Sequence, residues 1–434
     1  MLVKASKIIG NKEIRNSLVT LFLRILGVLT LFVFTLFFNR NYSANIVGDY
    51  EFTRMFLLVA GGICIFGTDV SILYFSGRFK SENNFYRIKD LYYKVLKLSL
   101  LLCLCLGIIF YLFFSKEKVN MIFGDTNSYK IISTCLFFLI FNVWTLFNTE
   151  VLRALDQVVW SELFRNTFKF FPIIVGAFFL YHSNKQEAII DFYIKGFVVL
   201  SLITSGFVII LLRKLEVTNE KLSKISYTEI LRYSIPMCVS SVIIYLLSTI
   251  DIIILRSYYS SIEVAYYALG IKLMSVLGMI ILSINVNISP RIAELYQNKD
   301  FDNLKILIRK SSWIIFILSL ISGIGLILFS GHILPFFGNQ YLVTQESLIL
   351  LIIGQIIISS LGSVSIYLNM TGRPKIFRII LLLALIINVF LNLLLIPKYG
   401  ILGASITYII TILFWNLSST IYVLKTDGIK TFIH

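Results

Sequence analysis

The sequence predicts an all-α membrane protein with twelve transmembrane helices, and three observations support this prediction. The 434 residues are 58% hydrophobic and only 14% charged, whereas a typical soluble domain is about 25% charged. The apolar residues form long continuous blocks rather than the short alternating segments of a β-barrel. Lys and Arg gather between these blocks. Ordinary soluble enzymes, disordered chains and secreted disulfide-linked domains are therefore excluded.

A helix that crosses about 30 Å of hydrocarbon needs about 20 apolar residues, and twelve blocks fit this length. In chain order they are 17–38, 47–74, 92–114, 131–149, 163–181, 188–212, 230–255, 264–289, 311–334, 346–370, 376–396 and 403–424. The fifth block has the most polar start, where Glu162, Arg165 and Lys169 share one helical face. This face can line the mouth of a cavity or simply meet lipid headgroups.

The basic residues predict the orientation of the chain. No small-residue cleavage site follows the basic N-terminus, so the first block is expected to be a retained helix and not a signal peptide. Counted over alternating loops, 26 Lys and Arg fall on the side of the N-terminus and 7 on the other side. Cytoplasmic loops are enriched in Lys and Arg, which predicts that both termini are cytoplasmic.

The loop at 213–229 divides the blocks into six and six. We therefore predict an N-terminal six-helix bundle over 1–212, a cytoplasmic linker over 213–229 and a C-terminal six-helix bundle over 230–434. Val47-Gly48-Asp49-Tyr50 opens the second block and Val264-Ala265-Tyr266-Tyr267 opens the eighth. This weak internal match favours two related bundles, which are typical of transporters.

The sequence offers no support for an enzyme. The five cysteines lie inside apolar blocks without metal-ligand spacing, so neither disulfides nor a metal site is expected. The common nucleophile and phosphate-binding motifs are missing. Even the longest loop, 290–310, has no room for a catalytic domain, which disfavours a membrane glycosyltransferase or polymerase. We expect a transporter without catalytic residues.

Several motifs follow one another along the whole chain and resemble a known family. They are Val47-Gly48-Asp49-Tyr50 with Leu152-Arg153-Ala154-Leu155; Tyr233-Ser234-Ile235-Pro236, Leu247-Ser248-Thr249-Ile250-Asp251, Glu263-Val264-Ala265-Tyr266-Tyr267 and Ser289-Pro290-Arg291; and Thr371-Gly372-Arg373-Pro374-Lys375, Asn388, Asn392 and Leu395-Ile396-Pro397-Lys398-Tyr399-Gly400-Ile401-Leu402-Gly403-Ala404. The last stretch is the most specific, and Ala265 departs from the usual Gly. The sequence resembles the polysaccharide flippases, or O-antigen transporters, whose superfamily also holds the MATE drug exporters and the lipid II flippases.

The resemblance implies a MATE-like fold and a flippase function. The expected substrate is a polyprenyl-diphosphate-linked oligosaccharide, a precursor of O-antigen in lipopolysaccharide, of capsule or of exopolysaccharide, moved to the outer leaflet of the bacterial inner (plasma) membrane. Other expected partners are membrane lipids and the polysaccharide polymerase and chain-length machinery, with no nucleic acid. No cofactor is expected, although H⁺ or Na⁺ can act as a counter-ion. The alternative is a MATE-like cation-coupled exporter of small molecules. It is disfavoured because the first block offers Arg24 where an acid is wanted.

Charged residues inside apolar blocks are costly, so they are the candidates for substrate binding. Arg24, Arg54, Lys195 and Lys272 lie inside the first, second, sixth and eighth blocks. Arg54 and Lys272 occupy nearly corresponding positions of the internal repeat. The two bundles are thus predicted to present cations to one central cleft that binds an anionic diphosphate.

Structural interpretations of these charges stay open. Arg54 and Lys195 can extend to the outer headgroups, and Arg24 can pair with Glu150 or Asp69. These two acids are also candidates for ion coupling or gating.

Asp251 is the third candidate for ion coupling or gating. It lies near the outer end of the seventh block, where a structural role, such as capping a helix or pairing with Arg256, is the other interpretation.

Overall fold

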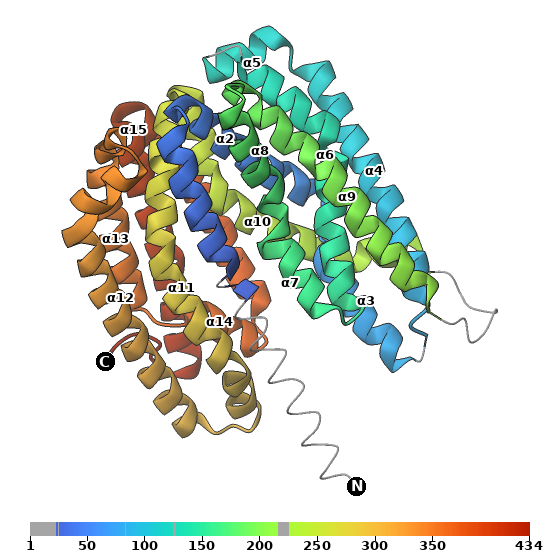
Figure 1. The fold of residues 1–434 in the computed structure, drawn as a ribbon. Coiled ribbons are helices and arrows are strands. Elements are labelled where there is room, and N and C mark those ends of the chain that lie inside the picture. The colour runs from blue at the N-terminus through green and yellow to red at the C-terminus, as the bar shows by residue number, and fades with distance from the viewer. Residues whose placement is uncertain (1–22, 25, 83, 125–126, 216–224) are drawn as a thin grey trace. The chain divides into compact units, whose positions relative to one another are not determined.

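The computed structural model describes the chain except residues 1–22, 25, 83, 125–126 and 216–224, which are drawn in grey in Figure 1. The described residues form helices joined by short turns, and no strand occurs among them. The predicted all-α class is therefore confirmed. The chain divides into two compact units. Unit 1 holds the described residues of 1–46 and 53–245, and unit 2 holds 47–52 and 246–434.

Nine helices of the described residues are long and apolar enough to cross a membrane, or ten if one bent pair counts as a single span. The first predicted block lies partly outside the described residues, and Leu26–Asn41 forms a shorter apolar helix there. The last two predicted blocks fall in one 54-residue helix, α15 (Pro374–Asp427), whose backbone is non-helical at Gly400. The count of twelve and the cytoplasmic position of both termini stay predictions.

The most extensive helix packing in unit 1 joins two long helices. These are α6 (Asn127–Ala154) and α9 (Ile189–Arg213). The side chain of Asn148 in α6 donates to the hydroxyl of Thr204 in α9 at 3.1 Å. Around them lie α2 (Ala44–Ile65), α3 (Thr68–Ser81), α4 (Arg87–Phe113), α5 (Lys116–Phe123), α7 (Val158–Asn166) and α8 (Phe171–His182). Such buried polar contacts fix the register of apolar helices, where packing alone is less specific.

Two breaks interrupt the helices of unit 1. Helices α2 and α3 meet at a bend of 43°, where Phe66 and Gly67 both have positive φ. A Cβ on Gly67 would lie only 2.5 Å from the backbone oxygen of Ser234, so the close approach requires glycine. The second break separates α7 from α8 by the 3₁₀ turn Phe168–Phe170, and Pro172 lies in the first turn of α8. Proline suits this position because its missing N–H is not needed there.

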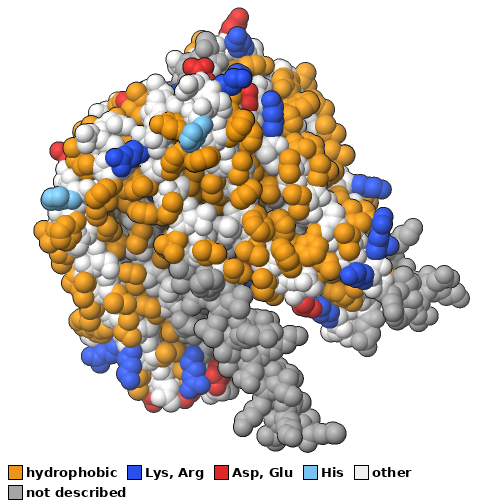
Figure 2. Space-filling model, viewed as in Figure 1, with side chains coloured by type: hydrophobic (Ala, Val, Ile, Leu, Met, Phe, Trp, Pro, Cys, Tyr) orange, Lys and Arg blue, Asp and Glu red, His pale blue; other side chains and the backbone are white. Residues whose placement is uncertain are grey.

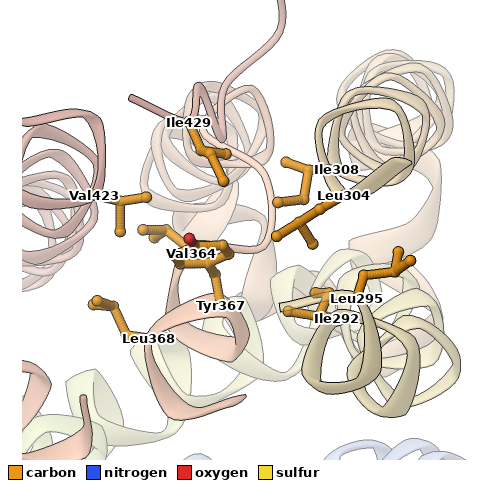
Figure 3. Close-up of a cluster of buried hydrophobic side chains, with 9 residues drawn as sticks. All are labelled: Ile292, Leu295, Leu304, Ile308, Val364, Tyr367, Leu368, Val423 and Ile429. Carbon is orange, nitrogen blue, oxygen red and sulfur yellow. The ribbon is translucent and has the colours of Figure 1, made fainter. Parts of the chain in front are cut away.

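Unit 2 contains the end of α10 (Tyr227–Tyr258), then α11 (Ser261–Gln297), α12 (Phe301–Phe337), α13 (Gln345–Ser359), α14 (Val364–Met370) and α15. Figure 3 shows one of its buried clusters, in which side chains of α11, α12, α14 and α15 converge with Ile429 of the C-terminal tail. The tail is held further by a hydrogen bond from the Ser312 hydroxyl to the Thr431 carbonyl at 2.6 Å. The chain beyond α15 is thus part of the packed unit.

The surface of each unit suits a lipid environment. In Figure 2, hydrophobic side chains cover most of the visible face, and the few Lys and Arg lie mainly toward its edges. Phe137 of α6 and Leu328 of α12 are 73% and 70% exposed. A soluble protein rarely exposes so much continuous apolar surface. The protein is therefore a multi-pass membrane protein.

Candidate functional site

Unit 1 contains a polar cavity of about 320 Å³. Helix α2 contributes Arg54, Leu58 and Gly62, which are four residues apart and therefore share one helical face. Helix α6 contributes Asn142, Thr145 and Thr149 with the same kind of spacing. The remaining lining residues come from α3, α7, α9, α10 and the break before α8: Asp69, Phe164, Arg165, Lys169, Phe170, Tyr193, Phe197 and Tyr245. The cavity is thus assembled from residues far apart in the sequence.

Five charged residues line the cavity, namely Arg54, Arg165, Lys169, Asp69 and Glu150. Arg165 forms an ion pair with Glu150 across the gap between α7 and α6. Lys169 lies over the ring of Phe170 at 4.8 Å, and no carboxylate pairs with it in the described part of the chain. Arg54 and Arg165 are near enough to repel it electrostatically. Three cations against two carboxylates leave this cavity with an excess of positive charge.

The break between α7 and α8 is what brings Lys169 into the cavity. Thr167 leaves the helical conformation, with φ −122° and ψ −61°, and the following 3₁₀ turn carries Lys169. The N-terminus of α8 begins directly after this turn, and its dipole has a positive end there. Discontinuous helices whose N-termini point at anionic groups are a recurring feature of transporter binding sites. The positive end of the α8 dipole and the positive charge of Lys169 therefore both favour an anion.

The structure brings together three of the residues that the sequence predicts as functional. Arg54, Asp69 and Glu150 all line the cavity. Lys195, on α9, is exposed and does not line it. Extension of the Lys195 side chain toward lipid headgroups stays a prediction.

Arg24 pairs with Glu162, an acid that the sequence put on one helical face with Arg165 and Lys169. Its guanidinium donates to both carboxylate oxygens of Glu162, at 3.0 and 3.1 Å, and not to Glu150 or Asp69, the two acids that the sequence left open as partners. Glu162 is only 1% exposed. It also accepts from the side chain of Asn166 at 2.8 Å. The acid that pairs with Arg24 is thus Glu162 of α7, which the sequence had not indicated as its partner.

Lys272, in α11, forms an ion pair with Glu51 of α2 within unit 2. It is not among the described residues that line the cavity of unit 1. Arg256 pairs with Asp49 at 3.4 Å, so the expected pair of Arg256 with Asp251 is also wrong. Asp49 and Glu51 lie near the predicted start of a helix, where acids are common, so the sequence alone does not mark them as partners of Arg256 and Lys272.

Asp251 lies in a buried polar network of unit 2. Its carboxylate accepts from the Tyr267 hydroxyl at 2.9 Å and from the Asn392 side-chain amide at 2.8 Å. Asn392 also donates to Asn388 at 3.0 Å, and Asn388 donates to Thr411 at 3.2 Å. No Lys or Arg pairs with Asp251 in the described residues, so its charge meets only neutral groups.

Arg165 and Lys169 line the cavity. The sequence alone allowed two positions for them, at the mouth of a cavity or against lipid headgroups. The signal that points to the cavity is the sequence Asn166-Thr167-Phe168-Lys169-Phe170-Phe171-Pro172. A proline in the first turn of a helix means that a break precedes it. This break places Lys169 at mid-span rather than on a continuous amphipathic helix.

Solved structures of known proteins share this fold. The lipid II flippase MurJ in an inward closed conformation is 18% identical and matches with a TM-score of 0.73, over 94% of this chain and 87% of that one. A multidrug resistance MATE transporter of the MOP superfamily, inward-facing, is 14% identical with a TM-score of 0.70, over 94% and 99% of the two chains. A MOP superfamily transporter from Pyrococcus furiosus is 15% identical with a TM-score of 0.62, over 95% of each chain.

Comparison of sequences gives a more specific result. The model of the family described as MatE matches residues 236–394. The model described as polysaccharide biosynthesis protein matches residues 14–296, which is more than half of the chain. An uncharacterized membrane protein of Methanocaldococcus jannaschii, MJ1375, is 30% identical over 184 residues, 42% of this chain, and the match spans 43% of that relative's length.

The fold of this chain is the one that these flippase and MATE structures share. Within this class, the chain belongs to the polysaccharide biosynthesis protein family. The resemblance seen in the sequence motifs is confirmed at this level.

Proposed function

We propose that this protein is a flippase for polyprenyl-diphosphate-linked oligosaccharides, the repeat units of a surface polysaccharide. One observation carries the proposal: an excess of positive charge on the wall of a polar cavity, inside a family of polysaccharide biosynthesis proteins. Charges within a membrane protein face cavities and mark the path of a substrate. A diphosphate offers the opposite charge and many acceptor oxygens.

The residues of the cavity suit the two parts of such a headgroup. Lys169 and Arg54 would bind the diphosphate, since Lys169 has no carboxylate partner in the described residues and Arg54 lies near it. Asn142, Tyr193 and Tyr245 offer hydrogen bonds and aromatic faces to sugar rings. The volume of about 320 Å³ lies at the lower end of ordinary ligand pockets, about 300–1,000 Å³. The lipid tail would stay outside, in the membrane.

The transport step would follow from the paired architecture. Twelve crossings with both termini in the cytoplasm remain our proposal, supported by the 26-to-7 division of Lys and Arg. Rocking of one bundle against the other would expose the headgroup first to the cytoplasm and then to the outside of the bacterial inner membrane. The interior-negative potential contributes about 2.3 kcal/mol per charge per 100 mV, which favours outward movement of an anion.

The polar network around Asp251 supports a second part of the proposal, a counter-ion. A buried carboxylate without a cationic partner is unfavourable in a membrane unless a cation binds it. The Asn392 Oδ1 atom beside it has no hydrogen-bond partner in the described part of the chain. We propose that H⁺ or Na⁺ binds at Asp251, with Asp69 and Glu150 as the acids that respond to the substrate in unit 1.

The test is flipping in vesicles that contain the purified protein and a fluorescent polyprenyl-diphosphate-linked glycan. Flipping is measured as the fraction of headgroups that a membrane-impermeant quencher fails to reach. Lys169→Gln and Arg54→Gln should each slow flipping by roughly tenfold or more, which corresponds to the loss of one charge-assisted contact of about 1.5–3 kcal/mol. Lys195→Gln is the matched control, because it removes one positive charge from an exposed position.

Two results would refute the flippase proposal. One is flipping by Lys169→Gln and Arg54→Gln at the rate of the Lys195→Gln control. The other is transport of organic cations by the wild-type protein without any flipping. The carboxylates Asp69 and Glu150 in the cavity are the observation that favours this alternative, a MATE-like exporter, and neutralising them should then abolish cation transport.

A further inference from the structure

One ion pair of unit 1 faces the polar cavity directly. Arg165 of α7 pairs with Glu150 of α6, and both residues line the cavity. Their side chains are 32% and 16% exposed. A guanidinium has five N–H donors in a planar fork, and one carboxylate cannot accept from all of them. An anion that enters the cavity can therefore reach Arg165 while Glu150 still holds it.

A second ion pair of α7 is closed by comparison. The carboxylate of Glu162 is 1% exposed. It accepts from Arg24 and also from the side chain of Asn166, and Glu162 is not among the described residues that line the cavity. The two acids therefore differ in their surroundings. Glu162 is enclosed by protein, whereas Glu150 borders the space that we assign to the headgroup.

Arg165 also belongs to a cluster of three cations within unit 1. Lys169 is near enough to both Arg54 and Arg165 to be repelled by them. Charges that are shielded from water interact strongly, because little solvent screens them. Three cations without any competing acid would hold a diphosphate tightly. A transported group, however, has to leave its site as well as enter it.

We propose that Glu150 competes with the diphosphate of the substrate for Arg165 and thereby helps to release the headgroup. In the free protein Glu150 holds Arg165. When the headgroup binds, Arg165 exchanges the carboxylate for a phosphate oxygen. When Glu150 takes Arg165 back, the diphosphate loses one of its cationic contacts. Glu150 acts through Arg165 and does not contact the substrate, so it is a positioning residue.

This inference rests on the proposed function, because it assumes that the cavity binds a diphosphate. It adds the residue that limits how tightly the headgroup is held. The competition has a consequence that loss of structure would not produce: removal of the Glu150 carboxylate should strengthen binding and slow release at the same time.

The first experiment measures flipping in vesicles as a function of glycan concentration. In Glu150→Gln the half-saturating concentration should fall by roughly tenfold, which corresponds to about 1.4 kcal/mol, and the maximal rate should fall as well. Glu150→Asp has a shorter carboxylate that reaches Arg165 less well, so it should shift both values in the same direction by less. It keeps the charge, and it decides the question if Glu150→Gln does not fold.

The matched control is Glu187→Gln. This substitution neutralises an exposed acid of unit 1 in the turn Gln186–Ala188, which is not among the described residues that line the cavity. It should leave both the half-saturating concentration and the maximal rate unchanged.

A second measurement does not depend on the glycan. Inorganic pyrophosphate carries the charged group without lipid or sugar, and calorimetry with the purified full-length protein gives its affinity. Glu150→Gln should bind pyrophosphate roughly tenfold more tightly than the wild type. In the background of Arg165→Gln the same substitution should change the affinity much less, because the two residues act through one contact. A general effect of the lost negative charge would persist in that background.

The outcomes separate the role of Glu150 from the identity of the substrate. Tighter pyrophosphate binding by Glu150→Gln, without any flipping of the glycan by the wild type, would support the competition and refute the proposed substrate. Flipping by the wild type, with values for Glu150→Gln equal to those of Glu187→Gln, would refute the competition and leave the flippase proposal intact. An equal gain in affinity with and without Arg165 would also refute it. Absence of pyrophosphate binding in the wild type and in Glu150→Gln would refute the anion site itself.

Discussion

The pair formed by Arg24 and Glu162 decides whether Arg24 contacts substrate or supports the fold. We expect Glu162→Gln and Arg24→Gln to lower stability together, through one shared interaction. The pair has two charge-assisted hydrogen bonds, at 3.0 and 3.1 Å, and each such bond contributes about 1.5–3 kcal/mol when buried. Arg24 is 37% exposed while Glu162 is 1% exposed, so solvent screening brings the expected coupling down to about 1–3 kcal/mol.

The assay is a double-mutant cycle of unfolding free energies in detergent, with the variants Arg24→Gln, Glu162→Gln and both together. Arg24→Gln should be the more destabilising single change, because it leaves the buried carboxylate of Glu162 without its counter-charge, whereas Gln at position 162 still offers an acceptor to Asn166. The double variant should be more stable than the sum of the two single effects predicts. Additive effects would refute the structural role. If Arg24→Gln then slowed flipping without destabilising the protein, Arg24 would be a substrate contact, as the sequence analysis predicts.

Two further predictions concern the bend between α2 and α3 and the polar network of unit 2. Gly67→Ala should destabilise the protein by more than about 1–2 kcal/mol, because a φ of +70° disfavours a Cβ by about that amount and the backbone of Cys238 would lie 2.4 Å from it. The control is Gly77→Ala, where a Cβ meets open space. Equal thermal unfolding midpoints for the two variants would contradict the prediction. Asp251→Asn should remove any dependence of flipping on an imposed Na⁺ or H⁺ gradient. The variant should stay folded, because Asn keeps the hydrogen bond from Tyr267. Gradient-dependent flipping by this variant would exclude Asp251 as the counter-ion site.

The helical class and most of the helices could be predicted from the sequence because they depend on local apolar composition. Eight of the predicted blocks, from 92–114 through to 346–370, correspond to apolar spans or to a span with its following short helix. What could not be predicted is where helices break. Phe66 and Gly67 interrupt a continuous apolar block, and the close approach that requires glycine at position 67 comes from Ser234, more than 160 residues away in the chain.

The candidate site was predicted in part for the same reason. A charge in an apolar block is visible in one sequence, so Arg54 was found, and so were Asp69 and Glu150. The partner of a charge is not visible, because it comes from another helix. Arg24, Arg54 and Lys272 look alike in sequence, and the structure distinguishes them by their neighbours: Glu162 for Arg24, Glu51 for Lys272, and a polar cavity for Arg54.

These neighbours distinguish two cations, Arg54 and Lys272, that nearly correspond in the predicted internal repeat. Glu51 and Arg54 lie one helical turn apart on α2, yet Glu51 belongs to unit 2 and Arg54 to unit 1. The cation that corresponds to Arg54 in the repeat, Lys272, is therefore neutralised by Glu51. Lys169 has no such acid in the described residues of unit 1. If the diphosphate binds where positive charge is left over, it binds beside Lys169 in unit 1. Glu51→Gln tests this division directly: it should lower the thermal unfolding midpoint, because the ion pair with Lys272 is lost, and leave the affinity of the Lys169 side for anions unchanged.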